Sequence, residues 1–275
     1  MAVSIPDTLT VNNSEKYILS IRLRSDGLSF SGYCPSVNNS FFYRDTEFDR
    51  TKPYISSLEE FFFAHEFLTY SYKQTNLVYV SPQYTVVPED VFVEKRQNDL
   101  LSFAFSSSLG KCLHNPLTRE AAEVVFNIED DVYGFCSRSL INPTFVHHIT
   151  PQLILWKQQS QGLVSRQMYV VIHRKMMDIA CLVQGKLLFV NSFGYDKPDD
   201  ILYYILYVWK QVGLDQEKDQ LHIYGSVSIC NNLRTTLQNY IQHIGQAEMP
   251  LEVYLLGTEV VQAPLDLIAL LVCEL

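Results

Sequence analysis

The sequence lacks the short motifs by which many enzymes are recognised. It contains no CxxC pair, no Walker A loop, no HExxH motif and no GxSxG motif. Lys and Arg number 21 against 30 Asp and Glu, and the net charge of -9 leaves no excess of the cations that bind a phosphate backbone. We therefore expect no nucleic-acid partner and none of the sites that these motifs mark.

Long apolar runs are also missing. None approaches the ~18–20 residues that a helix needs to span a bilayer. The first ten residues have no basic segment followed by an apolar one, so they do not read as a signal peptide. The six cysteines are scattered, and several lie inside apolar runs, as buried thiols do in a reducing compartment. We expect a cytoplasmic protein with no membrane span.

Disorder is excluded by what is present. The chain of 275 residues is 47% hydrophobic and only 19% charged, which allows a large core. This length favours two domains, or one fold built from two halves. The 17 Tyr and 16 Phe can fill that core or leave aromatic surface for a protein partner.

The second half of the chain has the clearest pattern. Three short apolar runs, at 168–173, 178–183 and 186–191, are separated by turn-length gaps and predict a three-stranded meander. An amphipathic helix follows, which we expect to be capped by Asp196 and to stop at Gly213. A strand at 220–224 comes next.

The first half repeats this order. Strands are predicted at 17–23, 28–33 and 41–48, with Ser25-Asp26-Gly27 as the first hairpin turn. We expect a capping box of Ser57 and Glu60 to begin the next helix. Residues 77–80 predict the fourth strand.

Later elements are expected from shorter signals. The first half continues with a helix starting at 88–90, a strand at 123–128 and a strand at 144–149. The second half continues with three elements, which are a helix at 233–244, a strand at 251–256 and a closing helix at 264–275. The polar joint at 158–162 predicts two domains, 1–160 and 161–275. The whole pattern is a duplicated βββαβα unit.

Three strings resemble a bacterial family of unknown function that has been assigned an actin-like fold. They are Leu77–Pro88 (LVYVSPQYTVVP), Phe145–His148 (FVHH) and Ala269–Leu275 (ALLVCEL). The duplicated unit is likewise similar to the actin-like ATPase branch of the ribonuclease H-like superfold. This resemblance covers nearly the whole chain, and it implies an α/β fold rather than a reaction.

The resemblance also implies where a nucleotide would bind. Actin-like ATPases hold ATP with Mg²⁺ between their halves, and each half offers a phosphate loop at its first hairpin, usually with Asp and Gly. The first hairpin keeps Asp26 and Gly27, but Leu28 replaces the Thr or Ser that usually follows. Asp-Gly is also a common hairpin turn, so the pair has a purely structural interpretation.

The second hairpin departs further from that pattern. Its sequence, Arg174-Lys175-Met176-Met177, has no Gly, and its only carboxylate is Asp178 within the strand. Gly225 and Ser226 follow the fourth strand, where actin-like ATPases have a Gly-rich adenosine-binding turn. One Gly at a strand-to-helix turn is also explained by the turn alone.

Two other kinds of site are disfavoured. A nuclease of the ribonuclease H type needs a carboxylate on its first strand for two-metal catalysis, and neither 17–23 nor 168–173 contains one. His147 and His148 are adjacent, so on a strand they would face opposite sides and could not share a metal. We assign no metal ligand and no catalytic residue.

The sequence favours a non-catalytic interaction or scaffold protein of actin-like fold that uses no cofactor and binds an unidentified protein. The alternative is a divergent ATP-binding protein or ATPase that uses Asp26, Gly27, Gly225 and Ser226 with Mg²⁺. A small-molecule kinase would need a catalytic base, and none can be assigned.

Overall fold

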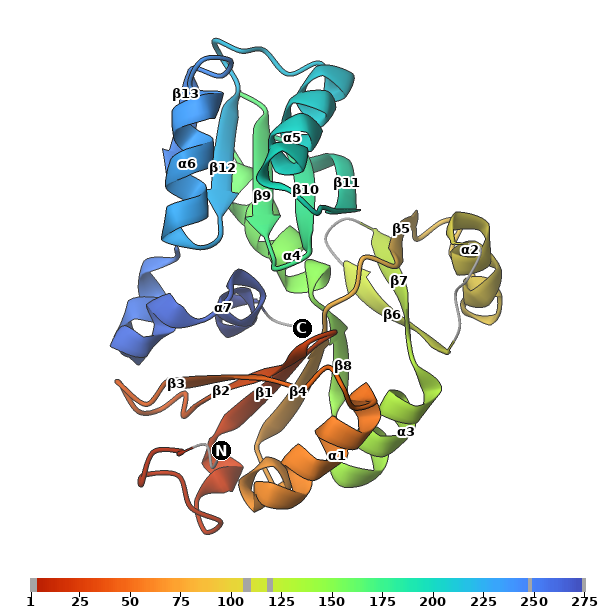
Figure 1. Ribbon diagram of the computed structural model, residues 1–275, viewed down its shortest axis with the longest axis vertical. Helices are drawn as coiled ribbons and strands as arrows, with labels where there is room; N and C mark the ends of the chain where they lie inside the picture. The colour runs from red at the N-terminus through yellow and green to blue at the C-terminus, as the bar shows by residue number, and fades with distance from the viewer. Residues whose placement is uncertain (1–3, 106–109, 118–120, 247–248, 274–275) are drawn as a thin grey trace. The chain divides into compact units, whose positions relative to one another are not determined.

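The computed structural model describes residues 4–105, 110–117, 121–246 and 249–273. The chain divides into two compact units. The first comprises Met1–Thr150 and Pro250–Val272, and the second comprises Pro151–Met249 and Cys273–Leu275. Each unit is built on its own five-stranded sheet (Figure 1). Among the described residues, every helix is too short or too polar to cross a bilayer.

The sheet of the first unit has the strand order β3-β2-β1-β4-β8. Neighbours are antiparallel from β3 to β1 and parallel from β1 to β8. The strands are β1 (Ile18–Arg24), β2 (Gly27–Tyr33), β3 (Phe42–Glu47), β4 (Gln74–Tyr79) and β8 (Thr144–His147).

The two faces of this sheet differ in polarity, because side chains alternate along each strand. Leu19, Ile21 and Phe30 lie on the apolar face and are fully buried. Helices α1 (Tyr54–Ala64) and α3 (Asp130–Ser139) cover that face (Figure 1). The opposite face carries small polar groups and a cation, and the C-terminal helix α7 (Leu265–Val272) covers it.

A second, three-stranded sheet lies between β4 and α3 in the sequence. Its order is β5-β7-β6, and its pairs are antiparallel. The strands are β5 (Tyr84–Pro88), β6 (Lys111–Leu117) and β7 (Ala122–Ile128), and helix α2 (Gln97–Ala104) packs on them through Leu101. Of these strands, only the third corresponds to one that the sequence predicted, at 123–128.

The sheet of the second unit has the order β11-β10-β9-β12-β13. Its neighbours are antiparallel from β11 to β9 and parallel from β9 to β13, so it repeats the order and directions of the first sheet. The strands are β9 (Gln167–Ile172), β10 (Met176–Val183), β11 (Lys186–Gly194), β12 (Gln220–Tyr224) and β13 (His243–Gln246).

Helices cover both faces of the second sheet (Figure 1). Met168 and Val170 of β9 join a core with side chains of α5 (Pro198–Val212) and α6 (Val227–Leu237). On the other face, Trp156 of α4 (Ile149–Ser160) stacks on Tyr169, with ring centroids 5.3 Å apart. The predicted meander, its helix and its fourth strand are confirmed.

The units differ from the expected halves 1–160 and 161–275. Residues 151–160 group with the second unit, and residues 250–272 group with the first. The reason is packing, since Trp156 stacks on β9 of the second sheet while Asp266 of α7 pairs with Arg22 of the first. The final helix predicted at 264–275 is present from Leu265 to Val272, and residues 274 and 275 lie outside the described ones.

Two predicted helix caps are wrong. Helix α1 begins at Tyr54 directly after Pro53, so Ser57 lies inside it and is buried, and Glu60 bonds Lys52 instead of an amide. In α5 the N-cap is Lys197, and the carboxylate of Asp200 accepts the Lys197 amide at 2.9 Å. Gly213 does end α5, with a φ of +70°.

Three later predictions are also wrong. Residues 251–256 form a 3-10 helix bounded by Pro250 and Gly257, whereas the last strand is β13, which overlaps the end of the predicted helix 233–244. Helix α6 begins at Val227, after a Gly225-Ser226 turn. Residues 88–90 end β5 and form a turn, and the next α-helix begins only at Gln97. Short apolar runs do not by themselves distinguish strand from helix.

Candidate functional site

The first hairpin turns at Ser25-Asp26, with Arg24 opposite Gly27. This confirms the predicted turn. Gly27 has a φ of +156°, and a Cβ there would lie 2.1 Å from the carbonyl oxygen of Thr46 on β3. The close approach of β3 therefore accounts for this glycine, whatever the hairpin binds.

Asp26 lies against a cation of its own hairpin. Its Oδ1 is 3.2 Å from Nε of Arg24, and its side chain is only 14% exposed. Arg24 also bonds the carboxylate of Asp45. Burial alone would lower the pKa of Arg24, but the hydrogen bond and charge of Asp45, together with the charge of Asp26, raise it above the usual value. The first hairpin thus holds a compact cluster of one cation and two carboxylates.

The second hairpin contains a buried polar cluster. Cross-strand pairing sets Asp178 of β10 opposite Val171 of β9 and opposite Ser192 of β11. His173, two residues beyond Val171, is then a diagonal neighbour of Asp178 on the same face. The side chain of Asp178 is 0% exposed.

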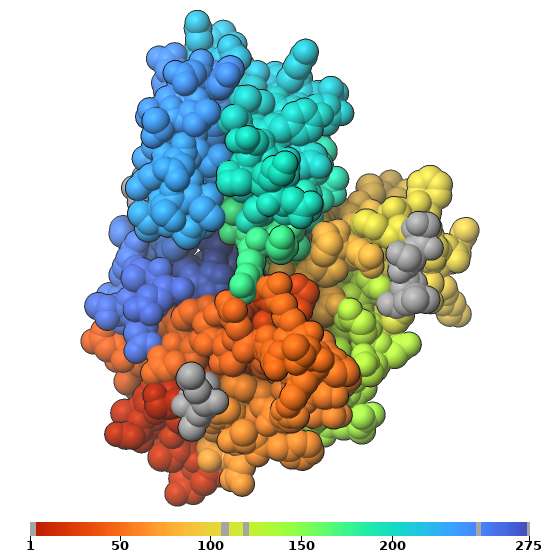
Figure 2. Space-filling model, in the orientation of Figure 1, coloured from red at the N-terminus to blue at the C-terminus, as the bar shows by residue number. Residues whose placement is uncertain are grey.

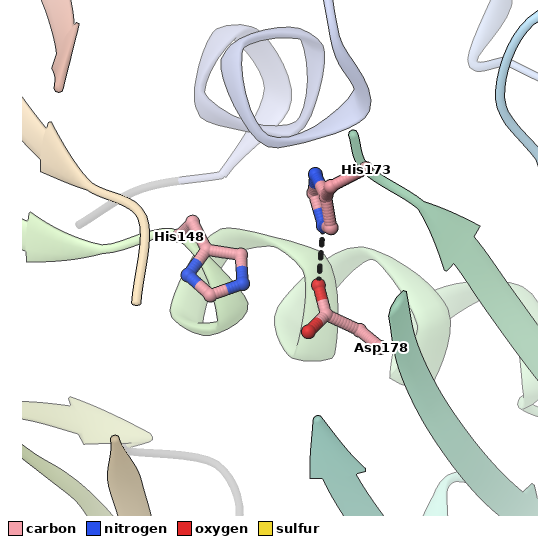
Figure 3. Close-up of side chains that lie close together, drawn as sticks. All are labelled: His148, His173 and Asp178. Carbon is pink, nitrogen blue, oxygen red and sulfur yellow. Dashed lines mark hydrogen bonds and ion pairs between the residues drawn. The ribbon is translucent and has the colours of Figure 1, made fainter. Parts of the chain in front are cut away.

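Two side chains bond the carboxylate of Asp178 from its two sides. Nε2 of His173 lies 2.7 Å from Oδ2, as the dashed line in Figure 3 shows, and the hydroxyl of Ser192 donates to Oδ1. The hydroxyl of Tyr195 donates to the carbonyl of His173 and fixes the backbone next to the turn. Figure 3 also draws His148, which belongs to the first unit.

This cluster could orient an imidazole or hold a cation. A carboxylate that accepts from Nε2 fixes the histidine tautomer, as carboxylates do in acid–base and metal sites. Within the second unit, the cluster offers one imidazole and one carboxylate, fewer than the three protein ligands of a catalytic zinc. Met177, beside it in sequence, is fully buried in the core formed with α5 and α6.

Gly225 and Ser226 form the turn between β12 and α6. Gly225 has a φ of +156°, and a Cβ there would lie 3.2 Å from Cβ of Ile172 at the end of β9. The turn therefore lies beside the second hairpin, at the carboxyl ends of two parallel strands. Ser226 is the N-cap of α6, but its side chain makes no capping bond, and its Oγ is 3.5 Å from that of Ser228.

His147 and His148 do not face opposite sides, because β8 ends at His147. Their ring centroids are 4.4 Å apart, and both rings lie near Tyr84. Nε2 of His147 is 3.0 Å from the carbonyl of Ser81, and both side chains are fully buried. The prediction of opposite faces is wrong, and the two rings pack together inside the first unit.

The candidate residues thus fall into two groups. Asp26 and Gly27 share the first hairpin, and Gly225 and Ser226 share the turn beside the second. Sequence reasoning missed the roles of Arg24, His173 and Ser192. The hairpin register was the available signal, since it places His173 and Ser192 next to Asp178 once the turn at 174–175 is fixed.

Comparison with known proteins now gives the family. Residues 6–244 match the family model described as "Protein of unknown function (DUF3822)". The chain belongs to this family. No curated protein matches it.

Solved structures agree with the fold. The chain is similar to a Bacteroides thetaiotaomicron protein described as having an actin-like ATPase fold and unknown function, with 29% identity and a TM-score of 0.84 over 98% of this chain and 100% of that one. It is also similar to a chain of the PilM-PilN type IV pilus biogenesis complex, with 10% identity and a TM-score of 0.51 over 84% and 88% of the two chains. The DUF3822 chain therefore has the α/β actin-like fold that its sequence predicted.

Proposed function

We propose that this DUF3822 protein is a non-catalytic interaction or scaffold protein of actin-like fold that binds another protein and uses no nucleotide. The observation that carries the proposal is the state of Asp178. This carboxylate lies on β10 beside the second hairpin turn, and it is fully buried and bonded by His173 and Ser192. A Mg²⁺ ion prefers oxygen ligands and retains several waters, which a buried and already bonded carboxylate does not favour.

The hairpin turn itself supports the same proposal. A phosphate loop needs backbone amides that approach the phosphate closely, which glycine permits. The second turn has Arg174-Lys175 instead, and the amide of His173 already bonds the carbonyl of Met176 at 2.9 Å. In the first hairpin, Asp26 is paired with Arg24.

Two further observations support a function in binding another protein. The second unit exposes aromatic side chains on α5, including Tyr203 and Tyr207. The PilM-PilN relative is one chain of a complex between proteins, so the fold is compatible with that use. The proposed compartment is the reducing cytoplasm, because all six cysteines are free thiols.

A second candidate, a divergent ATP-binding protein, is favoured by the Gly225 turn. The turn leaves the first amides of α6 without a side-chain cap, beside Ser226 and Ser228. Helix N-termini at the carboxyl edge of parallel strands are common phosphate sites. For this second candidate, the arginine of the first hairpin would contact phosphate and its carboxylates would contact Mg²⁺.

Isothermal titration calorimetry with ATP and ADP, each with and without Mg²⁺, tests the choice. The proposal expects no heat of binding at millimolar nucleotide. It also expects no rise in the melting temperature when thermal unfolding is measured with the same nucleotides. A Mg²⁺-dependent affinity in the micromolar range, about -8 kcal/mol, would favour the second candidate. That candidate further requires Gly225→Val to abolish binding.

Gly162→Val is the matched control for this variant. Gly162 belongs to the same unit, also has a positive φ of +77°, and a Cβ there would have no heavy atom within 4 Å. Loss of nucleotide binding in Gly225→Val but not in Gly162→Val would place the nucleotide at the α6 turn.

A further inference from the structure

The strand β11 (Lys186–Gly194) forms one edge of the second sheet. In the part of the chain that the structure describes, β11 pairs with β10 on one side and with no strand on the other. The corresponding edge of the first sheet, β3, is covered instead. The amides of Asn39 and Phe41 beside it donate to carbonyls of residues 255 and 256, and the Tyr43 amide donates to Glu259.

The composition of β11 is unusual for an exposed edge. Its sequence KLLFVNSFG has five apolar side chains, no proline and a single charge, which is at its first residue. Leu188 is 46% exposed, and none of the nine residues is fully buried. Natural edge strands are protected by charges, proline or a covering element, because their free amides and carbonyls pair with other strands.

An aromatic row continues this edge onto α5. Ring centroids are 6.4 Å apart for Phe189 and Phe193, 4.6 Å for Phe193 and Tyr204, and 5.3 Å for Tyr204 and Tyr203. Tyr203 then stacks on Tyr207, with centroids 5.8 Å apart, and these two tyrosines are 59% and 48% exposed. Figure 2 shows the outer surface of α5 in cyan, uncovered by the rest of the second unit.

Two properties select a second copy of the same strand as the occupant. The first is charge, since β11 begins at Lys186 and is followed by Asp196, whose side chain is 91% exposed and whose Oδ1 lies 3.8 Å from Nζ of Lys175. The second is the hydrophobic pattern. An antiparallel pairing with its two-fold axis at Asn191 sets Phe189 opposite Phe193 and brings Lys186 to the Asp196 end of the other copy.

The register is regular where this pairing needs it. The pairing of β10 with β11 shifts only between Cys181 and Leu182, so the stretch from Phe189 to Gly194 is free of the irregularity. An antiparallel pairing about such an axis leaves the equivalent faces of the two sheets on the same side. The two α5 helices would therefore lie on one side of the joined sheet. Tyr203 and Tyr207 would then extend the interface beyond the strands themselves.

We propose that the protein forms a symmetric dimer in which β11 pairs antiparallel with β11 of a second copy about Asn191. The joined sheet buries the aromatic row and places Lys186 against Asp196 at both ends. Cross-strand aromatic pairs and opposite charges stabilise such a seam, and like charges directly opposite each other destabilise it. This proposal does not depend on whether the protein binds a nucleotide.

Sedimentation velocity at micromolar concentration tests the dimer. The wild type is expected to sediment as a species with twice the 31.7 kDa mass of one chain. Asn191 is exposed, so Asn191→Lys and Asn191→Glu should leave the monomer folded. Each variant alone places like charges on the axis and is expected to be monomeric, whereas an equimolar mixture restores the dimer because Lys then faces Glu.

Asn231→Lys and Asn231→Glu are matched controls, since Asn231 is an exposed asparagine of α6 in the same unit and these variants should remain dimeric. A monomeric wild type would overturn the proposal and would leave the edge to a strand from a different protein. Monomeric variants whose mixture stays monomeric, while circular dichroism shows them folded, would overturn the two-fold pairing at Asn191.

Discussion

Arg22 and Asp266 form a buried ion pair, with 2.6 Å between Nε and Oδ2, although 244 residues separate them in sequence. Their side chains are 4% and 0% exposed. Arg22 lies on the polar face of β1, and Asp266 lies in the first turn of α7, so the pair fixes the C-terminal helix to the first sheet.

Asp266→Ala should therefore destabilise the first unit strongly. Removing one partner of a buried ion pair costs about 3–5 kcal/mol, because the remaining buried charge loses this opposite charge. Urea unfolding followed by fluorescence measures the loss. The double variant Arg22→Met with Asp266→Leu should recover most of it, and a double variant as unstable as Asp266→Ala would show that the charge is not the cause.

The exposed pair Arg44–Glu259 is the control for that experiment. Its side chains are 28% and 40% exposed, and its Nη1–Oε2 distance is 2.8 Å. Because solvent screens such a pair, Glu259→Gln should cost only about 0–1 kcal/mol. Equal losses of unfolding free energy in Asp266→Ala and Glu259→Gln would contradict the argument that burial makes the Arg22–Asp266 pair more costly to break.

Gly27→Ala tests the close approach of β3 to the first hairpin. The new Cβ would lie 2.1 Å from the Thr46 carbonyl oxygen at a φ of +156°, so β3 must move. We expect a loss of roughly 2–4 kcal/mol in the free energy of unfolding. Gly162→Ala, which meets no atom within 4 Å at a φ of +77°, should lose only about 1 kcal/mol. Similar losses would show that backbone strain alone is responsible.

Asp178→Ala tests the buried cluster of the second hairpin. It removes the carboxylate that accepts from His173 and Ser192, at a cost of about 1–3 kcal/mol for each lost bond. Asp178→Asn keeps an acceptor oxygen and should cost less. Thermal unfolding gives the order of stability, and nitrogen chemical shifts of His173 should change in both variants. An unchanged His173 spectrum would exclude the bond.

Stability should fall on acidification because of His222. Burial lowers the pKa of His222 from 6.5 to about 4, while the unfolded chain keeps the ordinary value. Between these two values the unfolded state binds more protons, so the free energy of unfolding decreases as the pH falls from about 6.5 to about 4. His222→Gln should flatten this slope in melting temperatures measured across that range. A variant with the wild-type slope would assign the acid sensitivity to other groups.

Local signals predicted much of the fold. Asp26-Gly27 marked the first hairpin because turn chemistry is short-ranged, and Gly213 ended α5 for the same reason. The inserted sheet was mostly missed, since β5 has only five residues, β6 contains Asn115 and Pro116, and both gain their stability from pairing with β7. Residues 251–256 were misassigned because six apolar-rich residues fit either a strand or a 3-10 helix.

The candidate site was predictable only in part. The position of the Gly225-Ser226 turn followed from the strand before it, and whether it binds a nucleotide stays a prediction. Charges inside apolar segments, such as Arg22 and Asp266, signal that each needs a partner. The sequence does not say which partner, because the pairing depends on how distant helices pack on each sheet.

The pairing of Arg22 with Asp266 also has a consequence for synthesis on the ribosome. Domains commonly fold as they emerge, N-terminal part first. Here the first sheet waits for α7, whose Asp266 lies 244 residues after Arg22. At ~5–20 residues per second, roughly 10–50 s separate Arg22 from its carboxylate. During that interval the polar face of the first sheet lacks the helix that covers it, so the first unit completes its folding only after α7 has been made.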